Sequence, residues 1–236
     1  MRLPKLADFV AILLLSVPLA AHAQTAASSQ TGAPEAGQRE PGLYMTFQTD
    51  KGNIACKLFE KESPITVGKM VGLAIGKISY IDPRTGQQNR NKFFDGLTFH
   101  RVIPGFMIQG GDPLGNGTGS PKGPGFPYQN ETSPGLTFNV PGRLAMANAG
   151  RDTNASQFFI TEAPQPSLNG GYTIWGQCQN QDIVKAIASV QRDSNDKPIT
   201  PVHIQHVVVE RVGPAPANAP EAMSAPAGSG QPAAKP

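Results

Sequence analysis

The chain has 236 residues, of which 39% are hydrophobic and 16% are charged, and its formal net charge at pH 7 is +3. The 20 basic residues nearly balance the 17 acidic ones and are not clustered with aromatic residues, which argues against a nucleic-acid-binding surface. The length between two compositionally biased ends suits a single domain with one core.

The N-terminal segment has the features of an export signal. Arg2 and Lys5 precede an apolar run over residues 9–20, and Ala21-His22-Ala23 supplies a small-x-small cleavage site before Gln24. The apolar run is shorter than the roughly 20 residues needed to span a bilayer. We therefore predict that residues 1–23 are a cleaved signal peptide and that the mature chain has no stable membrane insertion. An uncleaved membrane anchor is the alternative.

The segments that flank the domain are rich in small and turn-forming residues. Residues 24–42 contain mostly Ala, Ser, Gln, Gly and Pro, and residues 214–236 repeat this bias without an aromatic residue. Neither segment can bury enough apolar surface to offset its ordering entropy. We predict a disordered linker at 24–42, a folded domain at 43–213 and a disordered tail at 214–236.

The domain begins with signals for a β-hairpin and a helix. Apolar residues alternate over 43–48 and again over 54–58, with a turn signal at 50–53 between them. Ser63 and Pro64 predict a helix start, with Ser63 as the capping side chain, and Gly76 predicts its end. Residues 78–91 are predicted to be a polar loop.

The rest of the domain is predicted to be mostly β. Short β-prone pieces at 98–102, 107–109, 157–161, 173–176 and 203–212 are separated by loops rich in Gly and Pro. A second helix is predicted over 181–190, capped by Asn180, because its apolar residues keep helical spacing. The glycine-rich segment 115–119 lacks the Lys-Ser/Thr pair of a phosphate loop and is predicted to be a flexible surface loop. The pattern indicates a β-barrel with two helices.

Two cysteines, Cys56 and Cys178, leave two alternatives open. In an oxidising compartment a pair invites a disulfide. Cys56 also alternates with Ile54 and Leu58 on one face of a predicted strand, where a buried free thiol packs well as a small hydrophobe.

Two long motifs give the most specific indication of function. Residues 99–112 read FHRVIPGFMIQGGD, and residues 144–150, LAMANAG, continue through Asn154 into SQFFI at 156–160. Both stretches closely resemble the signature of the cyclophilin family, and the resemblance extends with gaps over most of 43–212. It implies a mainly β fold, a closed eight-stranded antiparallel β-barrel with two flanking α-helices, and peptidyl-prolyl cis/trans isomerase activity. No cofactor or metal is implied.

Rotation about an X-Pro bond requires no nucleophile, because no covalent bond is made or broken. Its barrier of about 18–20 kcal/mol comes from amide resonance, and the uncatalysed step can limit folding. In the twisted state the prolyl nitrogen loses conjugation, so a fixed donor beside it stabilises the transition state more than either planar state. By resemblance, Arg101 is the catalytic arginine; a surface arginine in a loop salt bridge is the alternative.

The resemblance also implies a peptide groove with an apolar socket. The proline ring needs a socket without donors, since its nitrogen carries no hydrogen. The alternatives are ordinary core packing for the socket residues and a strand cap for Gln157. The implied socket residues are Phe106, Met107, Phe159 and Leu168, with Tyr172 at the rim, and the implied groove residues are Gln109, Ala147, Asn148, Ala149 and Gln157.

Several positions depart from the family pattern. Ser167 stands where many members carry tryptophan, so we expect weaker cyclosporin binding. Tyr172 stands where many carry histidine, and the insertion at 78–92 is expected to border the groove. His100 is interpreted as a structural hydrogen-bonding group, because isomerisation moves no proton. His203 and His206 lack the neighbours of a metal site.

The predicted partners are proline-containing unfolded or extended polypeptides, and we expect a monomer. The short loops and Tyr172 resemble bacterial members, so the predicted location is the periplasm, with secretion as the alternative. Two other functions are weighed: a non-catalytic module that holds proline-containing segments, and a small-ligand carrier. A carrier would need a hollow barrel, whereas the inward aromatic and branched residues indicate a filled one.

Overall fold

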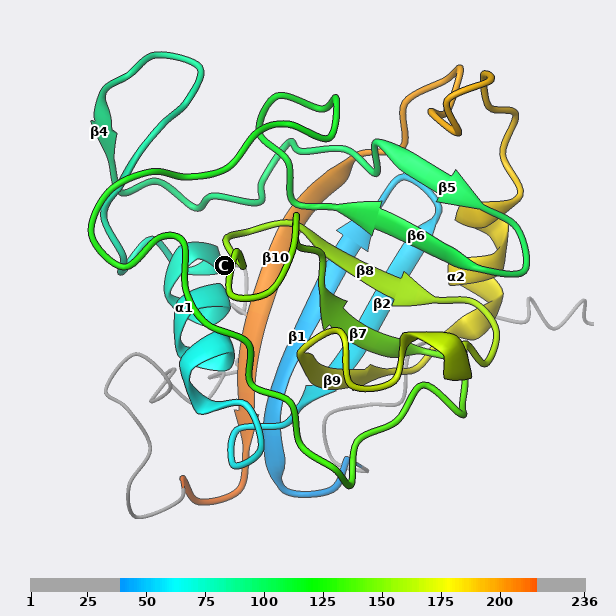
Figure 1. The fold of residues 1–236 in the computed structure, drawn as a ribbon, viewed down its shortest axis with the longest axis horizontal. Coiled ribbons are helices and arrows are strands. Elements are labelled where there is room, and N and C mark those ends of the chain that lie inside the picture. Colours follow the sequence, from blue (N-terminus) through cyan, green and yellow to red (C-terminus); the bar gives the residue numbers. More distant parts are fainter. Residues whose placement is uncertain (1–38, 216–236) are drawn as a thin grey trace, which may run out of the picture. The chain divides into compact units, whose positions relative to one another are not determined.

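A computed structural model describes residues 39–215 of the chain (Figure 1). The predicted signal peptide lies outside the described residues, as do most of the predicted linker and tail. Within the described part, the first strand begins at Gly42 and the last ends at Val212. No helix in this part of the chain is long and apolar enough to cross a membrane.

One antiparallel sheet of eight strands forms the body of the domain. Two helices, α1 (Pro64–Ala74) and α2 (Gln181–Ala188), pack against it (Figure 1). The order of the strands across the sheet is β10 (Ile204–Val212), β1 (Gly42–Thr49), β2 (Gly52–Leu58), β9 (Ile174–Cys178), β7 (Arg143–Met146), β8 (Phe158–Thr161), β6 (Met107–Gly110) and β5 (Arg101–Ile103).

The sheet is an open half-barrel, so the predicted closed barrel is wrong. Its edge strands β10 and β5 form no ladder with each other. Instead, the loop before β5 meets the start of β10, where the Phe99 amide donates to the Val202 carbonyl at 3.0 Å. The Val102 amide of β5 donates to the carbonyl of Asp196, in a loop, at 2.8 Å. With only three residues, β5 is too short to complete a closing ladder.

The opening hairpin is confirmed. β1 and β2 pair around the predicted turn, and the alternating residues Leu43, Met45 and Phe47 are fully buried. The same alternation buries Ile54 and Cys56 on β2. Burial of large apolar side chains on one face fixes the register, because a slip by one residue would expose all of them.

The helix α1 begins and ends as predicted, but the prediction that the Ser63 side chain caps it is wrong. The Ser63 hydroxyl donates to the Ile174 carbonyl at 2.8 Å and makes no cap hydrogen bond. The Glu131 carboxylate accepts the amides of Ile65 and Thr66 instead, at 2.9 and 2.7 Å. A carboxylate suits this position, since the unpaired amides at a helix N-terminus carry partial positive charge.

The second helix is two residues shorter at its C-terminal end than predicted, ending at Ala188. Asn180 does not cap it. Its backbone is left-handed, with φ of 59°, and its side-chain oxygen accepts the Ala55 amide of β2 at 3.3 Å. The side chain thus joins the helix start to the sheet, a long-range use that local pattern does not indicate.

The segment 78–92 is a small hairpin rather than the predicted loop. β3 (Tyr80–Ile81) pairs with β4 (Gln88–Asn89), and the Asp82 carboxylate accepts hydrogen bonds from Arg84 in the turn between them. Tyr80 is buried edge-on against Phe93, with ring centroids 4.9 Å apart. This aromatic contact anchors an otherwise polar segment to the core.

Of the two alternatives for the cysteines, the structure has the disulfide. Cys56 and Cys178 lie directly opposite each other in the β2–β9 ladder and are bonded, with an S–S distance of 2.10 Å. The free-thiol alternative required only that Cys56 be buried, which it also is. The register of β2 against β9, which are far apart in the sequence, decides between the disulfide and the free thiol.

Candidate active site

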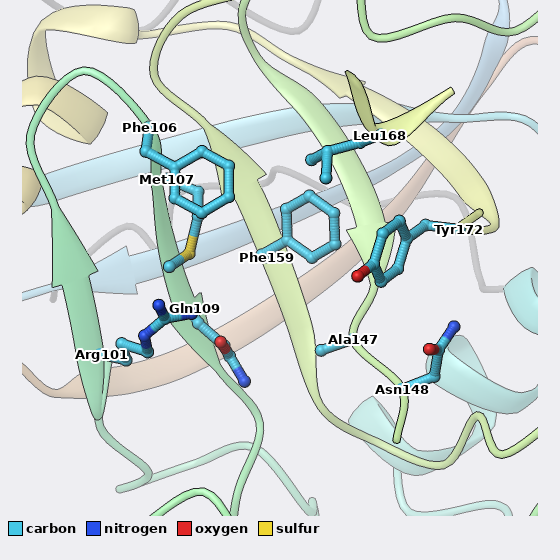
Figure 2. Close-up of a pocket in the computed structure, with 9 residues that line it drawn as sticks. All are labelled: Arg101, Phe106, Met107, Gln109, Ala147, Asn148, Phe159, Leu168 and Tyr172. Atoms are coloured by element: carbon cyan, nitrogen blue, oxygen red, sulfur yellow. The ribbon is translucent and has the colours of Figure 1, made fainter. Parts of the chain in front are cut away.

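A cavity of about 250 Å³ opens over strands β5, β6 and β8 (Figure 2). Every residue that lines it is among those implied by the family resemblance. These residues are Arg101, Phe106, Met107, Gln109, Ala147, Asn148, Phe159, Leu168 and Tyr172.

Strand pairing brings the central residues of the cavity together. In the antiparallel ladders, Gln109 of β6 lies directly opposite Arg101 of β5 on one side and opposite Phe159 of β8 on the other. Residues directly opposite each other point to the same face of a sheet. Met107, two residues before Gln109, shares that face. One row across three strands therefore presents a cation, an amide and an aromatic ring.

The floor of the cavity is apolar and fixed. Met107 and Phe159 are almost fully buried. The Phe159 ring is stacked on Phe138 at 5.8 Å and meets Tyr172 edge-on at 5.5 Å between centroids. Phe106 and Leu168 are half-buried and cover opposite sides of this floor (Figure 2). Phe138 was not identified from the sequence as part of the site, because a single aromatic residue in a loop carries no periodic signal.

Arg101 supplies the positive charge at the cavity. Its side chain is 43% exposed, and its Nε lies 3.7 Å from Oδ2 of Asp196. Figure 2 shows the guanidinium close to Gln109 and below the apolar floor. Asp196 was not identified from the sequence as a partner of Arg101, because no sequence pattern links two residues that lie so far apart in the chain.

Ala149 and Gln157 lie in an adjoining hollow of about 390 Å³ and not in the first cavity. The two spaces share Gln109, Ala147 and Asn148 in their walls, so they form one continuous groove. The Asn148 side-chain oxygen accepts the Gly150 amide at 3.3 Å, while its nitrogen has no hydrogen-bond partner within residues 39–215. This nitrogen is buried in the groove wall, so Asn148 contributes to the wall a fixed polar group that is unpaired among the described residues.

Gln157 organises the polar end of the groove rather than capping a strand. Its side-chain nitrogen donates to the Gly117 and Gly119 carbonyls at 3.0 and 2.9 Å, and its oxygen accepts from Gln109 at 3.0 Å. The buried carboxylate of Asp112 holds the same glycine-rich loop through backbone amides, including that of Asn116 at 2.9 Å. The segment predicted to be flexible is therefore tied down from two sides.

Replacing Gln157 with leucine should raise KM for an X-Pro peptide by about 3- to 10-fold and leave kcat nearly unchanged, since the Gly117 and Gly119 carbonyls lose their donor and the groove wall loosens. Steady-state kinetics, together with amide exchange of residues 115–119, measure both effects. The matched control is Gln177→Leu, because Gln177 also donates to backbone carbonyls but lies outside the groove. An unchanged KM in Gln157→Leu would contradict the assigned role.

His100 is buried, but the interpretation of it as a hydrogen-bonding group is wrong. Neither ring nitrogen has a partner among the described residues. Burial lowers the pKa of the imidazole, and this effect outweighs the rise caused by the nearby Asp112 carboxylate. The ring is therefore neutral near pH 7. It lines a third hollow next to Arg101, together with Asp193 and Lys197.

Of the departures from the family pattern, Tyr172 lines the cavity, whereas Ser167 does not. Ser167 is exposed in a short 3₁₀ helix, Pro166–Leu168. None of the residues that line the cavities described here comes from 78–92, so the expectation that this insertion borders the groove is not supported. His203 and His206 pair with Asp50 and Asp95, and residues 39–215 contain no cluster of side chains that could hold a metal ion.

Comparison with known proteins agrees with this geometry. Residues 44–209 match the family model described as cyclophilin type peptidyl-prolyl cis-trans isomerase/CLD. The chain is 46% identical over 172 residues to peptidyl-prolyl cis-trans isomerase B of Streptomyces anulatus, covering 71% of this chain and 97% of that protein. It is 45% identical over 167 residues to peptidyl-prolyl cis-trans isomerase A of Mycobacterium tuberculosis, covering 70% and 90%.

Solved structures show the same likeness. A cyclophilin type peptidyl-prolyl cis-trans isomerase of Cryptosporidium parvum, crystallised in the presence of the dipeptide Ala-Pro, matches with a TM-score of 0.62 and 29% sequence identity. The match covers 72% of this chain and 99% of that one.

Proposed function

The chain belongs to the cyclophilin-type peptidyl-prolyl cis-trans isomerases, and from this premise we propose that it accelerates X-Pro rotation in polypeptides that fold after export. The observation that carries the proposed mechanism is the position of Arg101, whose guanidinium stands at the edge of a fixed apolar cavity. A donor held there acts on the prolyl nitrogen only when the amide is twisted.

The cavity suits a proline ring. Met107 and Phe159 offer an apolar floor without donors, and a volume of about 250 Å³ suits a small ring and not a large ligand. The relative crystallised with Ala-Pro supports the same class of ligand for this chain. Because the reaction is a rotation, binding, orientation and electrostatic stabilisation are all that these residues need to provide.

The continuous groove suits an extended peptide around that proline. Gln109 and Asn148 border both hollows, while the small side chains of Ala147 and Ala149 keep the wall low. Amide side chains can bind the peptide backbone without reading sequence. We therefore infer broad recognition of unfolded or extended chains, with proline as the one required residue.

Export is proposed from the N-terminal segment and the disulfide. The cleavage pattern before Gln24 supports export of the mature chain from the cytosol, and a buried Cys56–Cys178 bridge suits an oxidising compartment. Fractionation of the native host, with mass measurement of the mature N-terminus, tests this. We expect a periplasmic protein that begins near Gln24; an unprocessed cytosolic chain would contradict it.

A non-catalytic holding module is the second candidate for the same groove. The molar ratio of this protein to its substrate at which refolding changes separates the two functions. An isomerase should accelerate the proline-limited refolding of a disulfide-free test protein at about one molecule per 100 substrates, whereas a holding module acts only near equal amounts and slows release. Exchange spectroscopy on a short Ala-Pro peptide provides the direct measurement. Binding without faster exchange would favour the holding module.

A further inference from the structure

Asp196 lies in the loop that meets the outer edge of β5, and its backbone is fixed on both sides. Its φ of 62° is left-handed, a conformation that Asp and Asn tolerate better than most residues. Its carbonyl accepts the Val102 amide at 2.8 Å, and its own amide donates to the Asp193 carbonyl at 3.1 Å. The loop is thus docked on β5 immediately beside Arg101.

The Asp196 carboxylate lies between two arginines. Oδ1 accepts from Nε of Arg192 at 3.1 Å, and Oδ2 lies 3.7 Å from Nε of Arg101. Arg192 therefore holds the carboxylate from one side while its other oxygen faces Arg101. Pairing at Nε leaves the two terminal nitrogens of Arg101 available to the groove, where Figure 2 shows them near Gln109.

Two effects of this carboxylate on catalysis oppose each other. Its negative charge weakens the field that Arg101 exerts on a prolyl nitrogen. It also restricts a long and half-exposed side chain, which would otherwise sample many rotamers and seldom present its donors in the required geometry. Because both side chains are partly exposed, water screens the charge effect, whereas misplacement of a catalytic donor by about 1 Å can be costly. Positioning should dominate.

We propose that Asp196 is a positioning residue, which orders the guanidinium of Arg101 for the twisted amide. The inference rests on the proposed catalytic role of Arg101 and goes beyond it by naming the group that holds the arginine in place. It assigns a function to a loop that lies 95 positions further along the chain than Arg101.

The test is Asp196→Asn in the mature chain. Asparagine keeps the left-handed backbone and the backbone carbonyl that accepts from Val102, and it replaces the carboxylate with a neutral amide that has one acceptor oxygen. We expect kcat for an Ala-Pro peptide to fall about five-fold with KM nearly unchanged, because the lost order affects the transition state. Raising NaCl from about 0.05 to about 0.5 M should lower wild-type kcat but not that of the variant.

Asp152→Asn is the matched control. Asp152 also has a φ of 62° and an arginine partner, with Nε of Arg151 at 3.6 Å, but this pair is not next to Arg101. It should leave kcat unchanged. In a heteronuclear NMR spectrum, the Arg101 Nε–H signal should broaden in Asp196→Asn, because the guanidinium loses its fixed position. The same signal should be unchanged in Asp152→Asn. General destabilisation would not produce this difference.

A double-mutant cycle separates failure of this inference from failure of the proposed function. If Arg101→Ala lowers activity and Asp196→Asn has no further effect in that background, Asp196 acts through Arg101. If Arg101→Ala lowers activity but Asp196→Asn alone leaves or raises kcat, the positioning role is overturned. If Arg101→Ala leaves activity intact, the catalytic role of Arg101 fails first.

Discussion

Replacing Arg101 with alanine should lower kcat/KM for an X-Pro peptide by about 100-fold, the usual effect of removing one donor that acts on charge developing in a transition state. The planar ground states do not expose the nitrogen lone pair, so the loss should appear mainly in kcat. Two-dimensional exchange NMR on an Ala-Pro peptide measures the rate at equilibrium and needs no coupled protease.

Two further variants show which property of Arg101 matters. Arg101→Lys keeps the charge but replaces a planar fork with a flexible point charge, so we expect activity between that of wild type and that of Arg101→Ala. Arg90→Ala is the matched control, because Arg90 is an exposed arginine that donates to the Lys77 carbonyl, away from the groove. Retention of wild-type activity by Arg101→Ala would show that the apolar cavity alone catalyses the rotation.

The residues of the cavity beside Arg101 were predictable from the sequence because most of them lie in two continuous motifs. Arg101 and Gln109 are separated by one tight hairpin, so their pairing follows from local chain reversal. The resemblance to a family placed Phe159 and Tyr172 beside them, and nine of the implied residues line one cavity. Periodicity alone would have left the same side chains as ordinary core.

Two of the errors concern contacts between distant parts of the chain. Whether the sheet closes depends on how β5 meets β10, about 100 positions apart, and a loop rather than a strand ladder fills that gap. Ser63 has the composition of a cap, but a nearby carbonyl takes its hydroxyl and Glu131 binds the helix amides instead. Local propensity identifies residues that are able to cap a helix, but tertiary contacts determine which residue binds the helix amides.

The disulfide is a contact of the same kind, and its effect on stability is expected to be large. Cys56 and Cys178 are 122 positions apart, so the bridge closes a long loop in the unfolded chain. The chain-entropy model assigns such a loop about 5 kcal/mol, and measured disulfides often reach about 2–4 kcal/mol. The double variant Cys56→Ala/Cys178→Ala should therefore lose about 3–5 kcal/mol of unfolding free energy.

Urea unfolding separates this entropic effect from a packing defect. If the bridge acts on the unfolded state, the double variant should show a lower midpoint and a larger m-value, because its unfolded chain is more expanded. Each single Cys→Ala variant should lose nearly as much as the double one, since either change breaks the same bond. Cys56 and Cys178 do not line the groove beside Arg101, so kcat/KM under native conditions should stay within about two-fold of wild type. Additive losses from the two single variants, with an unchanged m-value, would show that side-chain packing rather than the crosslink stabilises the domain.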